Sequence, residues 1–179
     1  MVEVFLDLDG VLVDLVSGLC RYHKIENPFN DPKNYGRYDV RHMAGMSSES
    51  FWGVLDHDFW LDLDWTDFGR SILNEVLKYV PVKQVTILTA PTGFPGCVDG
   101  KISWVNKHLP RFNYFVGRNK KAIAGPNKLL IDDHDVNIDE WTEAGGPAIH
   151  VPLLSNRLYH LPTLSYVKEK LENYFNRTG

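Results

Sequence analysis

Near the amino terminus an apolar segment runs directly into two carboxylates, and this feature constrains the fold most. Residues 4–6 are Val, Phe and Leu, and Asp7, Asp9 and Gly10 follow them. A short apolar run bounded by a turn residue is typical of a buried strand. Carboxylates this close repel each other unless a cation or a shared proton lies between them. We therefore expect a divalent cation such as Mg²⁺, which prefers oxygen ligands, at this end of the strand.

The same design returns later in the chain. Residues 129–131 are apolar and lead into Asp132 and Asp133, and a second apolar run, residues 85–88, ends at Thr89. Open α/β sheets bind ligands at the carboxyl ends of their strands, so these groups are expected to converge at one edge. Scattered carboxylates alone would indicate a solvated surface. Two acidic pairs at strand ends instead favour a functional site.

The order of the remaining segments predicts an α/β fold. Apolar strand segments alternate with helical patterns, which favours a doubly wound, mostly parallel sheet. Strands are expected at residues 4–6, 85–88, 112–116, 128–131 and 148–151, and helices at 15–22, 71–79, 101–108, 137–144 and 164–175. Residues 15–79 interrupt this alternation, so we expect a core of residues 1–14 and 80–179 with residues 15–79 inserted as a small helical unit.

The inserted segment holds an unusual density of large aromatic side chains. Phe51 and Trp52 follow two serines, of which Ser47 or Ser48 could cap a short helix. Such rings are typical of the core of a small insertion. One or two of them can also line a pocket in which a planar base stacks, a contact worth about 1–3 kcal/mol per base. Both interpretations can hold together, and Phe51 and Trp52 are the candidate substrate contacts.

Charge and cysteine content exclude several classes of protein. A net charge of −4 gives no reason to expect stable binding to nucleic acid or to an anionic membrane. Cys20 and Cys97 have no metal-ligand spacing, so reduced thiols and a cytoplasmic location are expected. The amino terminus lacks the pattern of a signal peptide, and no apolar run approaches the ~20 residues of a membrane span.

Four segments, taken in order, resemble the motifs of the haloacid dehalogenase superfamily. They are residues 7–11 (Asp-Leu-Asp-Gly-Val), the strand that ends in Thr89, a downstream lysine, and the pair Asp132 and Asp133. The resemblance implies a Rossmann-like core with a small helical cap after the first motif. The aspartate at position 9, the third residue of the first motif, resembles the pattern of the phosphatase branch of that superfamily.

Within the superfamily the chain is most similar to the 5′(3′)-deoxyribonucleotidases and related phage-type phosphatases. Residues 101–105, residues 129–133 with 137–138, and the aromatic insertion carry this likeness. The chain departs from that group at position 90. Residues 89–91 are Thr-Ala-Pro here, whereas the group tends to have Thr-Ser-Pro. A hydroxyl donor to the phosphate or the sugar is therefore missing here.

The resemblance implies a role for each motif residue. Asp7 is the expected nucleophile that forms an aspartyl-phosphate, and Asp9 is the expected general acid and base. Mg²⁺ is expected on Asp7, the backbone carbonyl of Asp9 and Asp133, with Asp132 acting through water or a hydrogen bond.

Phosphate contacts follow from the same resemblance. The Thr89 hydroxyl and the Ala90 N–H are expected to hold the phosphoryl oxygens. Lys121 is favoured as the motif lysine and Lys101 as a secondary substrate contact, although lysines are mostly solvated surface residues.

We expect the chain to be a Mg²⁺-dependent phosphomonoesterase. Its expected partner is a small phosphate ester, and the favoured substrate is a (deoxy)nucleoside monophosphate. Three alternatives stay open: another small phosphate ester, a 3′-phosphate on a nucleic-acid end, and a non-catalytic module that binds a phosphorylated ligand. One sequence also leaves open a homodimer formed through the insertion or the last helix.

Overall fold

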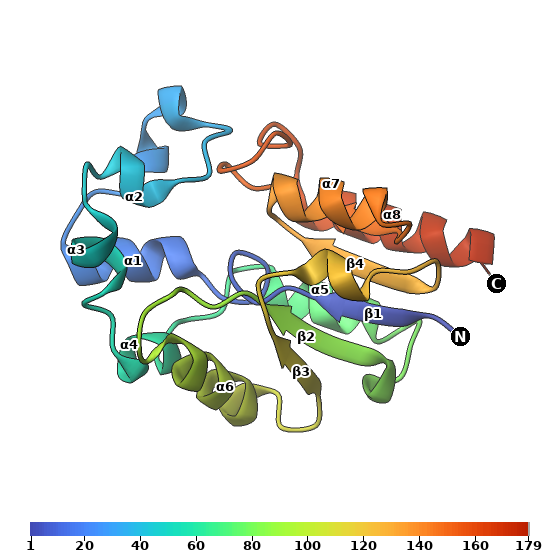
Figure 1. Ribbon diagram of the computed structural model, residues 1–179. Coiled ribbons are helices and arrows are strands. Elements are labelled where there is room, and N and C mark those ends of the chain that lie inside the picture. The colour runs from blue at the N-terminus through green and yellow to red at the C-terminus, as the bar shows by residue number, and fades with distance from the viewer. Residues whose placement is uncertain (179) are drawn as a thin grey trace.

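The computed structural model describes residues 1–178 and contains a five-stranded parallel sheet. The strands are β1 (Glu3–Leu6), β2 (Val85–Thr89), β3 (Asn113–Val116), β4 (Lys128–Asp132) and β5 (Ala148–His150), in the order β3-β2-β1-β4-β5 (Figure 1). The predicted doubly wound α/β fold is thereby confirmed. β1 lies at the centre because its side chains are apolar on both faces, as a strand covered on both sides requires.

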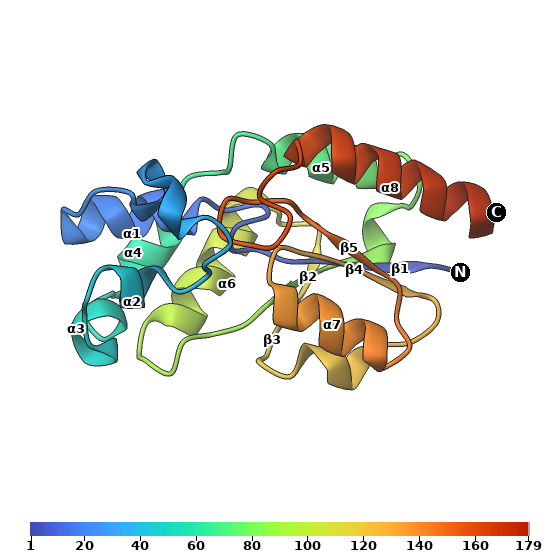
Figure 2. The same cartoon turned by 90° about the horizontal axis from the view of Figure 1, so that it is seen from above.

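Helices cover both faces of this sheet. α5 (Gly69–Val76) and α8 (Thr163–Thr178) lie side by side on one face, and α7 (Asp135–Glu143) lies on the other (Figure 2). Phe5 points toward α7 and contacts Trp141, whereas Val4 and Leu6 belong to the larger core on the opposite face. This alternation is the period of two that a strand imposes on its side chains.

Strand register places the predicted site residues at one edge. Leu6 pairs with Ile87 of β2 and with Ile131 of β4. The residues that follow these three positions therefore lie together at the carboxyl edge of the sheet. Both carboxylate pairs and Thr89 belong to those residues.

Four short helices stand beyond that edge (Figure 1). They are α1 (Leu15–His23), α2 (Val40–Met43), α3 (Ser48–Trp52) and α4 (His57–Leu61), with 3₁₀ turns at Pro28–Asn30 and Pro32–Asn34. Asp14, Ser47 and Asp56 cap three of them by accepting hydrogen bonds from backbone N–H groups. The predicted limits of the insertion, 15–79, stay a prediction; α5 lies within them and packs against α8.

α6 (Cys97–His108) packs against α4 of the cap, the name used here for α1–α4 and the turns between them, and also contacts β3. It begins four residues earlier than predicted, after Gly96 in the left-handed conformation at φ 85°. A Cβ on Gly100 would lie 2.5 Å from the Cβ of Trp60, so only glycine lets α4 approach α6 this closely.

The remaining elements are 3₁₀ helices at Val82–Gln84 and Lys120–Ile123. Both cysteines are buried free thiols, Cys20 in α1 and Cys97 in α6. Across residues 1–178, no helix has the length and apolar character needed to cross a membrane.

Candidate active site

The turn after β1 brings Asp7 and Asp9 to the edge of the sheet. Asp7 extends the strand pairing by donating its backbone N–H to the carbonyl of Ile131 at 2.9 Å. Gly10 then adopts φ +77°, a conformation that L side chains rarely take. A Cβ at this position would also lie 2.6 Å from a carboxylate oxygen of Asp133. Gly10 therefore both turns the chain and makes room for Asp133.

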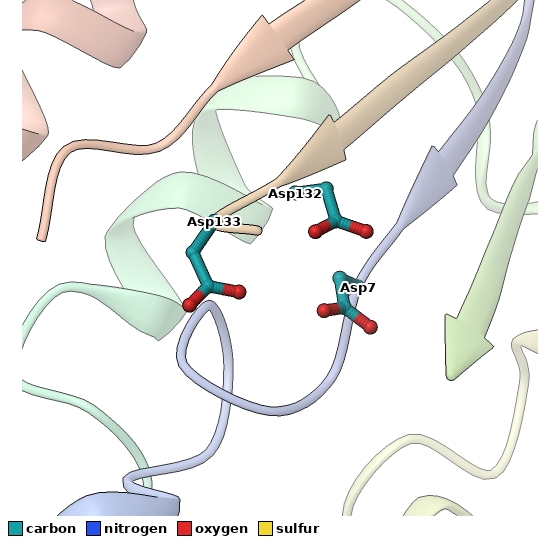
Figure 3. A group of neighbouring side chains, drawn as sticks. All are labelled: Asp7, Asp132 and Asp133. Carbon is teal, nitrogen blue, oxygen red and sulfur yellow. The ribbon is translucent and has the colours of Figure 1, made fainter. Parts of the chain in front are cut away.

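Three carboxylates converge at this point. Asp7, Asp132 and Asp133 each offer an oxygen, and these oxygens all lie within 4.8 Å of one another. Figure 3 shows Asp7 and Asp132 at the ends of neighbouring strands, with Asp133 facing the loop that follows β1. All three side chains are buried, so their charges interact strongly.

One buried ammonium lies among these carboxylates, and it is not the predicted one. Lys120 Nζ is 2.7 Å from Asp7 Oδ1 and 2.7 Å from Asp132 Oδ2. Lys121 instead lies on the surface and pairs with Glu140 at 2.8 Å. Both lysines belong to a 3₁₀ helix with about three residues per turn, so neighbours point in different directions. The structure therefore corrects the prediction: Lys120, and not Lys121, contacts the acidic cluster.

A second buried lysine holds Asp9. Lys101 Nζ contacts Asp9 Oδ2, and it donates to Thr89 Oγ1 at 3.1 Å and to the carbonyl of Ala90 at 2.7 Å. Its ammonium also lies 5.0 Å from the ring centroid of Trp60 in the cap. The sequence predicted Lys101 as a substrate contact, and the structure brings it together with Asp9, Thr89 and Ala90.

The two predicted aromatic contacts have different surroundings. Phe51 is completely buried and stacks on His23 with ring centroids 4.7 Å apart, so its prediction as a substrate contact is wrong. Trp52 is half-buried and lines a cavity of about 350 Å³ beside the acidic cluster. Apolar cap residues and polar core residues share its wall: Leu15, Val16, Leu19 and Val40 with Asp9, Gly10 and Asp133.

Sequence reasoning gave no role to two residues of the site, Tyr38 and Asn137. Tyr38 lines the same cavity, and its ring lies 4.0 Å from that of His134 between centroids. Tyr38 remains 45% exposed. Asn137 donates to both oxygens of Asp132 from the first turn of α7, and its segment, residues 137–138, had contributed only to the family resemblance.

The oxygens of Asp132 are already occupied. They accept from Lys120, from Asn137 and from the backbone N–H of His134. By contrast, Asp133 Oδ1 and Asp9 Oδ1 are buried without a hydrogen-bond partner. Buried acceptors of this kind need a ligand, a water or an ion.

The charge of the cluster suits a divalent cation. Three carboxylates and one ammonium leave two negative charges when all four groups are ionised. Burial, and then Asp132, raises the pKa of Asp7 from 3.8 to about 7. Burial, with Asp132 and Asp7, likewise raises the pKa of Asp133 well above 3.8. Burial opposes the charge on Lys120, but Asp132 and Asp7 outweigh it and raise the pKa of that lysine. Oxygen donors with this residual charge fit Mg²⁺.

The raised pKa of Asp7 predicts how Mg²⁺ should act on stability. Between 3.8 and about 7 the folded state binds more protons at Asp7 than the unfolded state does, so cation-free protein loses stability as the pH rises through this window. Mg²⁺ should offset that loss. We expect the rise in Tm caused by Mg²⁺, measured against a chelator, to grow from about pH 5 to about pH 8. A rise in Tm that is independent of pH would contradict binding of Mg²⁺ by the Asp7 carboxylate.

Comparisons with known proteins agree with this geometry. Residues 1–161 match the family model described as 5′ nucleotidase, deoxy (pyrimidine), cytosolic type C protein. A curated human protein, 5′(3′)-deoxyribonucleotidase, cytosolic type, is 30% identical in an alignment 151 residues long; the match covers 75% of this chain and 71% of that protein.

Solved structures show the same fold at low identity. A HAD-superfamily hydrolase of subfamily IA from Geobacter sulfurreducens PCA superposes with a TM-score of 0.56 at 15% identity, covering 97% of this chain and all of that one. L-2-haloacid dehalogenase from Xanthobacter autotrophicus gives a TM-score of 0.51 at 15% identity, covering 96% of this chain and 88% of that one. Identities this low are evidence for the fold alone.

Proposed function

The chain belongs to the 5′ nucleotidase, deoxy (pyrimidine), cytosolic type C family, and from this premise we propose the reaction and the residues that perform it. The chain is a hydrolase of the haloacid dehalogenase (HAD) type, and we propose that it is a Mg²⁺-dependent phosphomonoesterase that acts on (deoxy)nucleoside monophosphates. The observation that carries this proposal is the group of Asp7, Asp132 and Asp133 around the ammonium of Lys120. The name of the human relative supports the substrate class and a cytosolic location.

In the first proposed step a carboxylate oxygen of Asp7 attacks phosphorus. An O–P bond forms to Asp7 while the bond from phosphorus to the leaving oxygen breaks, which gives an aspartyl-phosphate. The leaving alkoxide takes a proton from Asp9. The free Oδ1 of Asp9 beside the cavity supports this role. A positioned acid or base of this kind contributes about 10²–10⁴-fold to a rate.

In the second step water attacks the phosphorus of the aspartyl-phosphate. Asp9 takes one proton from this water, the bond between phosphorus and Asp7 breaks, and inorganic phosphate leaves. Asp9 is then protonated again and ready for the next substrate. Lys101 holds the Asp9 carboxylate through both steps, because its ammonium is fixed by Thr89 and Ala90.

The proposed cation ligands are the carboxylates of Asp7 and Asp133 and the backbone carbonyl of Asp9. When bound, Mg²⁺ supplies positive charge that shields the nucleophile from the phosphate dianion. Asp132 is proposed to act indirectly, because Lys120 and Asn137 already occupy its oxygens.

Charge that develops on the transferring phosphoryl group needs fixed donors nearby. We assign Lys120, the Thr89 hydroxyl and the Ala90 N–H to this task. Position 90 lacks a hydroxyl, so the phosphoryl group has one donor fewer than the Thr-Ser-Pro pattern provides.

The substrate class is tested by phosphate release from a panel of esters, with and without Mg²⁺. The panel holds deoxy- and ribonucleoside 5′- and 3′-monophosphates, sugar phosphates, an aryl phosphate and an oligonucleotide with a 3′-phosphate. We expect Mg²⁺-dependent release, fastest from the nucleoside monophosphates. Faster release from a sugar phosphate or from the oligonucleotide would favour that substrate class. Binding of nucleotide without any release would favour the non-catalytic module.

Trp52 tests whether the cavity binds the base. Base stacking on an aromatic ring is worth about 1–3 kcal/mol, so Trp52→Leu should raise KM for nucleoside monophosphates by roughly tenfold. The KM for an aryl phosphate with a smaller ring, and kcat for both, should change far less. Phe51→Leu is the matched control, since that ring lies in the cap core. Equal changes in KM for both substrates would contradict base stacking on Trp52.

A further inference from the structure

The loop between β5 and α8 contacts the backbone of Asp133 through one buried amide. Asn156 is completely buried, and its Nδ2 donates to the carbonyl of Asp133 at 2.8 Å and to that of Val151 at 2.8 Å. Its Oδ1 accepts from the backbone N–H groups of Leu153 at 3.3 Å and Leu158 at 3.0 Å. One side chain therefore ties its own loop to the residue that follows β4.

The carbonyl of Asp133 accepts a second hydrogen bond from a buried side chain. His150, the last residue of β5, places Nε2 at 3.0 Å from the same oxygen. Because a carbonyl can only accept, His150 carries a proton on Nε2. Asn156 and His150 together fix the peptide group of Asp133.

This peptide group needs support from outside the sheet. β4 ends at Asp132, and the last backbone hydrogen bond to β5 runs from Val151 to the carbonyl of that residue at 2.8 Å. Asp133 lies one residue further, with its carboxylate against Gly10 and its Oδ1 unpartnered. The direction of this carboxylate therefore depends on a backbone that side chains of other segments hold.

The same loop also contacts the cap and the cavity. The carbonyl of Leu154 accepts from the backbone N–H of Gly36 at 2.8 Å, and Tyr159 lies 5.7 Å from Tyr35 between ring centroids. Leu153 and Ser155 line the cavity beside Asp133. The loop is thus held at the cap on one side and at Asp133 on the other, which limits movement of Asn156.

We infer that Asn156 is a positioning residue for the proposed cation site, acting through the Asp133 peptide group. This inference rests on the proposed function for the identity of the cation. Groups that hold the ligands of a metal without touching the metal itself typically change its affinity by 10–100-fold when they are removed. Asn156 is placed to have an effect of this kind.

The test measures Mg²⁺ binding to the full chain by calorimetry, together with steady-state kinetics. Asn156→Ala should weaken Mg²⁺ binding by about 10–100-fold. At saturating Mg²⁺ its kcat should recover most of the wild-type value, with KM for the ester nearly unchanged. Thr163→Val is the matched control: it removes another anchor of the same loop, the 2.7 Å hydrogen bond to the carbonyl of Pro152, without contacting Asp133. This control should bind Mg²⁺ like the wild type.

A second variant keeps the inference testable if Asn156→Ala does not fold. His150→Leu removes the other donor to the same carbonyl and should weaken Mg²⁺ binding in the same direction. If the Asn156→Ala and His150→Leu variants fold and bind Mg²⁺ as tightly as the wild type, the positioning role is overturned. An equal loss of Mg²⁺ affinity in Thr163→Val would also overturn it. Either result would leave the proposed cation site intact. Absence of Mg²⁺ binding by the wild type would overturn the proposed cation site and this inference together.

Discussion

Replacing Asp7 with asparagine is expected to lower phosphate release by roughly four to six orders of magnitude, the scale on which loss of a covalent nucleophile acts. The amide has nearly the same shape as the carboxylate but cannot form the aspartyl-phosphate. The measurement is phosphate release from an aryl phosphate and from a nucleoside monophosphate at saturating Mg²⁺.

The same variant should be at least as stable as the wild type when no cation is present. Asp7 is buried beside Asp132, and its raised pKa of about 7 means that its ionised form is disfavoured in the folded protein. A neutral amide removes this cost. The gain in Tm should be small near pH 4, grow up to about pH 7 and stay constant above it. Stability and activity should thus change in opposite directions, which separates loss of the nucleophile from loss of folding.

Asp9→Asn is the matched control for this experiment. It is an equally conservative change two residues away, and it removes the acid and base but keeps the nucleophile. Its loss should be smaller, about 10²–10⁴-fold, and smallest for an aryl phosphate whose leaving group needs little protonation. Turnover of Asp7→Asn at the wild-type rate would exclude the aspartyl-phosphate route.

The convergence of the site could be predicted because it follows from the sheet. Parallel strands have their carboxyl ends at the same edge of the sheet. One apolar run leads into Asp7 and another into Asp132, so the two carboxylates are predicted to lie close together at that edge. The pattern needed no knowledge of individual contacts. For the same reason each strand end was predicted to within one residue, inside the usual uncertainty of such boundaries.

Choices between adjacent residues could not be predicted. Lys120 and Lys121, like Phe51 and Trp52, are neighbours on helices only four and five residues long. A helix this short has too little periodicity to indicate which of two similar neighbours faces the interior. The rotation of each helix depends on packing against distant segments, here the ends of β1 and β4 for the lysines.

The contribution of the β5–α8 loop was also beyond sequence reasoning. Asn156 acts through hydrogen bonds from a side chain to backbone carbonyls, and any residue can offer a carbonyl. Such contacts leave no spacing pattern, and a single asparagine in a loop is ordinarily read as a turn residue. Tyr38 was missed for a similar reason, because its contact with His134 joins segments far apart in the chain.

The corrected lysine assignment leads to the second large effect. Lys120→Met should reduce kcat by about 10²–10³-fold or more, because it removes a fixed positive charge from the phosphoryl site. It should also destabilise the cation-free protein, since Asp7 and Asp132 then face each other without their shared ammonium. Removal of one partner from a buried ion pair costs about 3–5 kcal/mol. Kinetics and thermal melting measure the two effects separately.

Lys121→Met is the control that decides between the neighbours. Lys121 is exposed and pairs with Glu140 at the surface, so its loss should leave kcat unchanged and shift stability by less than about 0.5 kcal/mol. Mg²⁺ should still bind Lys120→Met, because loss of the ammonium leaves the carboxylates more negative. If Lys120→Met binds Mg²⁺ but turns over slowly, its defect lies in stabilising the charge that develops in the transition state. An equal loss of activity in both lysine variants would instead contradict the assignment of Lys120.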